Sequence, residues 1–286
     1  MARPAPIRLA GMIAATATFA AVATEAPDAR AQSQDRTIVL NNQLQLGDVV
    51  AGETLNVVDT SEQVTVSASA QGNSLAGSVQ NDAIDIRSTQ EMRGDAVATA
   101  DMTFGGETEG VVNAVVQAGG NYLAGGAYDA DLAVHATQLN TGGEVSATST
   151  IAGGTARLLD GASVGVSAIS NTIALGGEGA SVSGVISQGS SATVRASNQA
   201  ATQYIPAQAA FSSQAIANAV AVNSEAASNQ ALYVRQRSTG DVIEAATSAN
   251  AGNAWDLAGR ARASGNQAVF ANQGGALIAE TDQGNT

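Results

Sequence analysis

The chain has 286 residues with 25 acidic and 12 basic side chains, a formal net charge of −13 and no cysteine. The negative charge disfavours nucleic acid and anionic lipid as partners, because both are polyanions that an acidic surface repels. The lack of cysteine excludes disulfide bridges and thiolate metal sites. Aromatic residues make up only 3%. A core of small aliphatic side chains is therefore expected, and it suits a stack of thin layers better than a globule.

The N-terminal segment has the order of a secretory signal. Arg3 and Arg8 precede an apolar run from Leu9 to Thr24, and Ala29-Arg30-Ala31 follows as a small-residue cleavage site. The apolar run of about 16 residues is shorter than the roughly 20 that a transmembrane helix needs. We therefore expect this segment to be cleaved on export across the inner membrane.

An asparagine recurs at steps of 48, 50, 47 and 48 residues through the rest of the chain, at Asn73, Asn121, Asn171, Asn218 and Asn266. A glutamine follows each asparagine after 17 residues, or after 18 in the fourth copy, at Gln90, Gln138, Gln188, Gln236 and Gln283. An alanine always precedes the asparagine by three residues, and an apolar residue follows it by two. Five copies in phase indicate a repeat architecture, in which each unit buries its apolar face against its neighbours.

The local pattern within the repeats is typical of strands. Leu132–Gln138 and Val145–Ile151 alternate with period two and are rich in β-branched residues. Four glycine pairs are expected at the joints between strands, where tight turns need positive φ: Gly105-Gly106, Gly142-Gly143, Gly153-Gly154 and Gly176-Gly177. Helix is the alternative for the alanine-rich stretch Ala215–Ala227. The sequence predicts an all-β, elongated β-solenoid of five repeats, each divided into two strand–arc–strand coils of about 24 residues.

In such a stack equivalent residues fall in register, so the asparagines and the glutamines would each form an amide ladder. The last repeat stops just after its glutamine, which leaves an open strand edge containing Leu277 and Ala279. We expect this edge to pair with a partner strand. The expected division of the chain is a signal peptide at 1–31, an N-terminal cap or atypical coil at 32–63, and the repeat solenoid at 64–286.

The run Val116–Asn121, VQAGGN, with the next glutamine at Gln138, resembles the curlin repeat of extracellular amyloid-type fibres. Together with export, the absence of cysteine and the Ala/Gly/Ser-rich repeats, it is similar to the holdfast anchoring protein D family of stalked alphaproteobacteria. The resemblance implies a non-enzymatic protein of the outer-membrane cell surface that helps anchor an adhesive exopolysaccharide. It implies companion anchor proteins and an outer-membrane secretion component as partners, with self-assembly as a further option and no cofactor.

Residues that carry chemistry are few. His135 is the only histidine and has no serine or carboxylate partner at motif spacing. The pairs Asp82/Asp85 and Asp129/Asp131 could supply the carboxylates of a glycosidase, so a β-helix polysaccharide-degrading enzyme is the alternative function. Glycine repeats that bind calcium carry a ladder of aspartates, which is absent here. No catalytic residue and no metal site is therefore expected.

Two single residues interrupt the repeat pattern. Pro206 is the only proline after the N-terminal segment, and it is expected at a loop or kink between the third and fourth repeats. Trp255 is the only tryptophan. It has two interpretations, a platform for stacking a sugar or a buried cap residue.

Overall fold

The computed structural model describes residues 36–240 and 242–286, so the predicted signal peptide at 1–31 lies outside the described residues. In those two ranges the chain forms strands and turns without a helix, which confirms the all-β prediction. The helix alternative for Ala215–Ala227 is wrong, because the stretch as far as Glu225 lies in strand β12 (Thr193–Glu225) and the remainder forms a turn. Within the same ranges, no helix is long and apolar enough to cross a membrane.

The strands form two parallel sheets. The six-stranded sheet has the order β1 (Thr37–Gln45), β4 (Ile84–Met92), β8 (Asp131–Asn140), β11 (Ser181–Ser190), β13 (Asn229–Ser238) and β15 (Leu277–Asn285). The nine-stranded sheet contains β2 (Val49–Val57), β5 (Ala96–Phe104), β9 (Glu144–Leu158), β12, β10 (Ala162–Glu178), β7 (Val112–Tyr128) and β3 (Val64–Gln80), with β14 (Ile243–Asn272) on β12 and the short β6 (Glu107–Thr108) on β9.

Each strand pairs with the equivalent strand one repeat further along the chain. Val64 lies beside Val112, and Asn121 lies beside Asn171. The step between laterally paired residues is 47 to 50 residues. The predicted division into coils of about 24 residues is therefore wrong, since the two halves of a repeat lie in different layers instead of stacking on each other.

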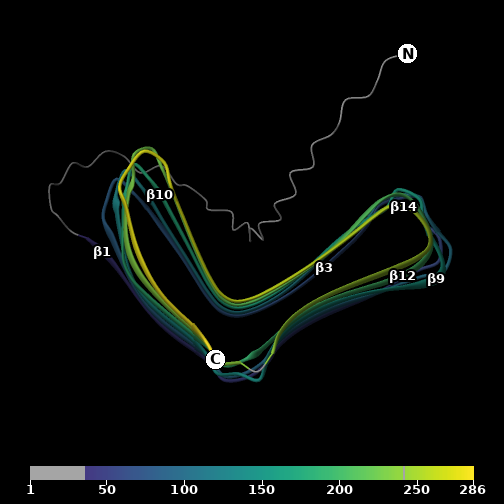
Figure 1. Cartoon of the computed structure of the whole chain (residues 1–286), viewed down its shortest axis with the longest axis horizontal. Helices are drawn as coiled ribbons and strands as arrows, with labels where there is room; N and C mark the ends of the chain where they lie inside the picture. Colours follow the sequence, from purple (N-terminus) through teal and green to yellow (C-terminus); the bar gives the residue numbers. More distant parts are fainter. Residues whose placement is uncertain (1–35, 241) are drawn as a thin grey trace, which may run out of the picture. The chain divides into compact units, whose positions relative to one another are not determined.

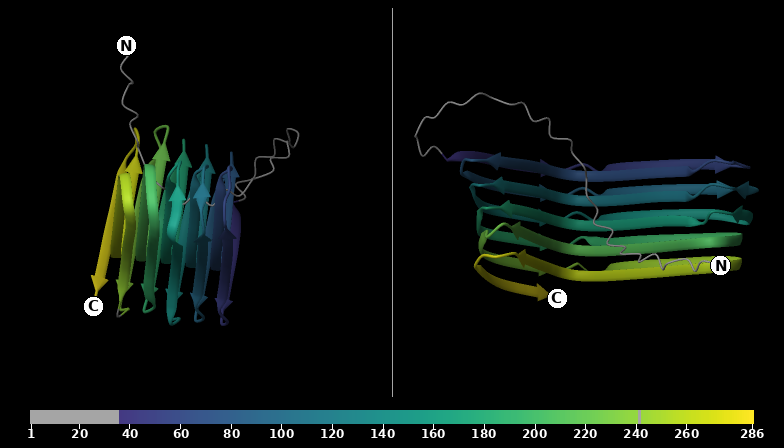
Figure 2. Two further views of the ribbon diagram at one scale, coloured as in Figure 1. Left: turned by 90° about the vertical axis from the view of Figure 1, so that its right-hand side faces the viewer. Right: turned by 90° about the horizontal axis from the view of Figure 1, so that it is seen from above.

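Every repeat follows the same bent path through two layers (Figure 1). In the second repeat, β7 runs along both arms of the bend, and the chain then turns and comes back as β8 in one arm and β9 in the other. Figure 2 shows the successive repeats as evenly stacked parallel rungs. One layer thus consists of β3, β7, β10 and the C-terminal halves of β12 and β14, which we call the long strands. The facing layer consists of the shorter strands together with the N-terminal halves of β12 and β14.

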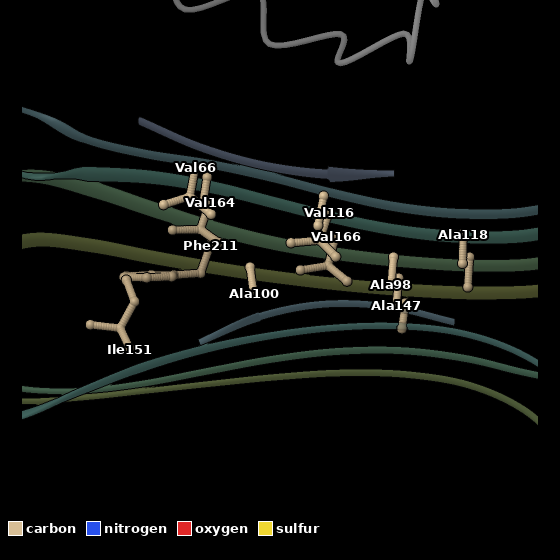
Figure 3. Packing of buried hydrophobic residues seen from close by; sticks show 14 of the residues in the cluster. Val66, Ala98, Ala100, Val116, Ala118, Ala147, Ile151, Val164, Val166 and Phe211 are labelled. Carbon is tan, nitrogen blue, oxygen red and sulfur yellow. The ribbon is translucent and has the colours of Figure 1, made fainter. Parts of the chain in front are cut away.

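Small aliphatic side chains fill the space between the layers in two clusters, one in each arm. In the arm that contains β9, Val66, Val164 and Phe211 occupy the same position on different strands of one layer. Ile151 lies on the facing layer (Figure 3). Phe211 is only 2% exposed. Truncating it to alanine would cost about 3–5 kcal/mol, the usual range for a buried aromatic side chain.

Of the four predicted glycine turns, Gly105-Gly106 and Gly142-Gly143 do lie between strands, but none of the four pairs has a positive φ and the other two pairs are not in turns. Gly153-Gly154 lies inside β9 and Gly176-Gly177 inside β10. Close packing explains two of these glycines, because a Cβ on Gly153 would lie 2.5 Å from the Cβ of Ala156 and one on Gly177 would lie 2.8 Å from Val182 Cγ2. Positive φ occurs instead at the turns that follow the long strands, at Asn81, Asp129, Gly179, Ala226, Ala227 and Gly274.

The N-terminal segment and Pro206 both take part in the sheets. Residues of the expected cap form β1 and β2, which pair with β4 and β5. Pro206 lies within β12, where the register with β14 shifts between Ile205 and Gln208. The predicted loop or kink is thus a local irregularity in a continuous strand, which accommodates the missing backbone N–H.

Candidate functional site

The asparagines of the repeat lie where each long strand passes from one arm to the other. In β7 both Gly120 and Asn121 are buried, so the alternation of inward and outward side chains shifts by one residue between them. This shift lets a single strand face the core in both arms. The second position must then bury a side chain, and a polar one is tolerated there only if its polar atoms are hydrogen-bonded.

The side-chain amides of these asparagines are bonded to one another. Asn121 Nδ2 donates to Asn171 Oδ1 at 2.8 Å and to the backbone oxygen of Leu139 on the facing strand at 2.8 Å. Its Oδ1 accepts from Asn73 Nδ2 at 2.8 Å. The structure brings all five predicted members into one column, Asn73, Asn121, Asn171, Asn218 and Asn266.

The glutamines form a second column, from the strands of the six-stranded sheet. Gln138 Nε2 donates to Gln90 Oε1 at 2.8 Å and to the backbone oxygen of Thr172 at 3.0 Å. Because Thr172 belongs to β10, each such bond also fastens the six-stranded sheet to the long strands. The predicted members of this column are all present, Gln90, Gln138, Gln188, Gln236 and Gln283.

A sixth member of the glutamine column was missed by the sequence analysis. Gln43 in β1 accepts from Gln90 Nε2 at 2.8 Å and donates to the backbone oxygen of Ser74 at 2.9 Å. It precedes Gln90 by 47 residues, a spacing that occurs elsewhere in the repeat. Extending that spacing backwards would have identified it, although no asparagine of the column accompanies it.

The two columns run in opposite directions. The asparagines donate toward the C-terminal end of the stack, from Asn73 to Asn266. The glutamines donate toward the N-terminal end, from Gln283 to Gln43. Hydrogen-bonded chains of amides polarise one another along their length. Opposed columns therefore leave a smaller net dipole than two columns running the same way.

The expected partner strand edge lies in β15. Among the described strands, β15 pairs only with β13, so its other side is open. Leu277 lies beside the buried Gln230, and Ala279 beside the buried Leu232, so both residues point toward the interior of the stack. Leu277 is nevertheless 46% exposed, since none of the described strands covers it.

An ion pair fastens β15 to its neighbour. Arg237 Nη2 donates to Asp282 Oδ2 at 2.6 Å, and its Nη1 donates to the Asp282 backbone oxygen at 3.0 Å. The hydrogen bond from Arg237 lowers the pKa of Asp282 below its usual value, against a weaker opposing desolvation, and the charges of Arg237 and Arg235 add to the lowering. The carboxylate is therefore charged at neutral pH and holds the edge strand in place.

Three of the aspartates considered for catalysis, Asp82, Asp129 and Asp131, line one open groove, whereas Asp85 and His135 do not. His135 is exposed on β8. Asp85 Oδ2 accepts from Arg87 Nη2 at 2.8 Å, and Asp129 lies in the turn that follows β7. Across residues 36–240 and 242–286, no three His, Cys, Asp or Glu side chains are gathered to hold a metal ion.

Trp255 is 87% exposed, so its interpretation as a buried cap residue is wrong. It lies in β14 two residues after Asn253, which lines a groove together with Arg157, Gln203, Tyr204 and Gly252. No signal in the sequence brought Arg157 and Tyr204 together with Asn253. Their proximity follows from the register of β9, β12 and β14.

The sequence model of the holdfast attachment protein D family matches residues 58–286. The matched span contains every asparagine of the column and begins after β1 and Gln43. No curated protein and no solved structure matches the chain.

Proposed function

Because the chain belongs to the holdfast attachment protein D family, we propose that it anchors an adhesive polysaccharide, the holdfast, to the outer membrane at the cell surface. It does so as a secreted, non-enzymatic β-solenoid of five repeats. One structural observation carries the proposal. Two buried amide columns run through successive repeats and connect each repeat to the next.

An anchor must transmit force from its ligand to its attachment point without separating its repeats. Here every junction between repeats combines main-chain bonds between parallel strands with one asparagine bond and one glutamine bond. Hydrogen bonds between buried amides are costly to break, because each buried polar group left without its partner lowers the stability by about 1–3 kcal/mol. The same bonds are repeated at each junction from the first repeat, with Asn73, to the last, with Asn266.

The predicted signal peptide at 1–31 supports export, and the expected location is the outer surface of the outer membrane. A chain that folds there has no access to ATP-dependent assembly and must be stabilised by its own contacts. The repeats can provide this stability, since each unit is held by contacts with its immediate neighbours alone.

We assign attachment to companion anchor proteins to the open edge of β15. A partner strand added there would gain affinity from main-chain hydrogen bonds and specificity from alternate side chains. Leu277 and Ala279 would then be covered by the inward residues of the added strand, while Ile278, now 70% exposed, would lie on the outer face.

The experiment is an extension of the chain after Thr286 by a short segment that contains proline and charged residues, which blocks strand addition. Retention of polysaccharide on cells carrying this variant is expected to fall, whereas a Gly/Ser extension of the same length leaves it unchanged. Equal retention with both extensions would rule out β15 as the attachment edge. Release of reducing sugar from the polysaccharide by the purified protein would instead favour the alternative function, a polysaccharide-degrading enzyme.

A further inference from the structure

Trp255 occupies an irregular position between β12 and β14. The register of the two strands shifts between Ile205 and Gln208, so two residues of β12 lie opposite this one residue of β14. A bulge of this kind changes the direction in which a side chain points. The indole is left 87% exposed. A large aromatic side chain normally contributes to stability through burial, and here its surface is available to a ligand.

A column of chemically distinct groups runs along the stack and ends on Asn253, two residues before this tryptophan. Glu107, Arg157, Tyr204 and Asn253 occupy equivalent positions on successive strands. Arg157 forms an ion pair with Glu107, and its guanidinium carbon lies 5.2 Å from the centroid of the Tyr204 ring. Successive strands are about 4.8 Å apart. An extended polymer lying along the stack would therefore meet these groups one after another.

The groove beside this column has the chemistry of a sugar site. It is shallow and open to solvent, with a volume of about 580 Å³, and is lined by Arg157, Gln203, Tyr204, Gly252 and Asn253. The lining combines an aromatic ring with amide and guanidinium donors and contains no large aliphatic side chain. A groove that binds an amphipathic peptide offers aliphatic pockets instead. A sugar ring fits, because its C–H face stacks on an aromatic ring and its hydroxyls bond to the amides.

The charges around the groove decide which class of polysaccharide it accepts. The guanidinium of Arg157 is already paired with the Glu107 carboxylate, so it offers little free positive charge. Asp256 follows Trp255 directly, and the whole chain carries a net charge of −13. An anionic polymer would be repelled. We infer that the Trp255 side chain and the adjoining groove bind a neutral or cationic polysaccharide, an inference that rests on the proposed function.

The test uses the intrinsic fluorescence of the purified chain, which reports on Trp255 alone because the sequence contains one tryptophan. The probes are a neutral β-glucan oligosaccharide, a cationic chitosan oligosaccharide and an anionic polyuronate. Addition of the neutral or the cationic probe is expected to shift the emission to shorter wavelength and to protect the indole from acrylamide quenching. The polyuronate is expected to do neither. Emission that stays unchanged with both non-anionic probes would overturn the inference.

Two variants test the site by affinity. Trp255→Ala and Tyr204→Ala should each weaken oligosaccharide binding, measured by calorimetry, about tenfold, the equivalent of losing one aromatic stacking contact. Tyr128→Ala is the matched control, since this aromatic is 43% exposed and lies away from the groove. Trp255→Ala should keep the wild-type circular dichroism, because the side chain is exposed. Full affinity in Trp255→Ala would contradict the inference whatever Tyr204→Ala does.

Cell assays separate this inference from the proposed function. If cells without the protein retain their polysaccharide normally, the proposed function fails, and the fluorescence titration still decides whether the groove binds sugar. If a companion anchor protein, and no oligosaccharide, shifts the Trp255 emission, the groove is a protein interface and the inference is wrong.

Discussion

Replacement of Asn121 by alanine tests whether the amide column holds the repeats together. The side chain is 1% exposed and makes three hydrogen bonds, to Asn73, Asn171 and the Leu139 backbone oxygen. Its removal leaves one N–H of Asn73 and one oxygen of Asn171 without these partners. At about 1–3 kcal/mol for each of these two buried polar groups left unsatisfied, the loss should reach about 2–6 kcal/mol.

Asn140→Ala is the matched control for this loss. Asn140 is also fully buried, but its Oδ1 accepts one bond, from the Gly142 N–H at 3.0 Å, and its Nδ2 has no partner within the described residues. Its replacement should cost about 1 kcal/mol. Urea unfolding followed by circular dichroism measures both variants, with midpoints compared because a repeat array need not unfold in two states. Equal shifts in the two midpoints would mean that the ladder bonds add nothing beyond burial.

Two further predictions concern the repeat and its last strand. Deletion of residues 121–170 removes one whole step of the register and joins Gly120 to Asn171 in phase, so the chain should still fold by circular dichroism and proteolysis. Deletion of residues 121–144 aligns strands of different layers and should abolish folding. If both shortened chains folded, the 48-residue step would be contradicted. Since the pKa of Asp282 is lowered, its ion pair with Arg237 is fully formed above the ordinary aspartate pKa of about 3.9 and is lost as pH falls through the lower folded value. The rate of amide hydrogen exchange in β15, corrected for intrinsic rates, should therefore be constant from neutral pH to about 4 and rise below that. Asp282→Asn should remove this pH dependence. A rise that begins near pH 6 would show that another group than Asp282 controls the edge strand.

The sequence predicted the strands and the lateral neighbours of the repeat because both depend on spacing alone. Once Asn73 and Asn121 are aligned, a parallel sheet places all intervening residues in register, as the pairing of β3 with β7 shows. The number of residues in one coil, about 24 or about 48, could not be predicted from spacing. Alternation of apolar and polar residues is the same whether the two halves of a repeat stack on each other or face each other across a core.

Single residues were harder to assign, because their surroundings come from other repeats. Gly177 is required by Val182, whose Cγ2 would lie 2.8 Å from a Cβ at that position, and the glycine pair therefore resembles a turn signal only in sequence. Trp255, which is exposed, lies opposite a register shift near Pro206 in the preceding repeat. Local propensity has no information about either contact.

The direction of the glutamine column makes its two ends chemically different. At the C-terminal end the glutamine column ends on Gln283 Oε1, an acceptor, whereas at the N-terminal end the glutamine column begins with the amide of Gln43, a donor. A strand that pairs with β15 completes the column only if it carries an amide donor opposite Gln283. It also needs small apolar residues opposite Leu277 and Ala279, since these residues continue the buried columns of Gln230 and Leu232. Partner specificity at this edge can therefore come from the same repeat pattern that folds the chain, and a companion protein that lacks an in-phase glutamine or asparagine would bind through main-chain bonds alone.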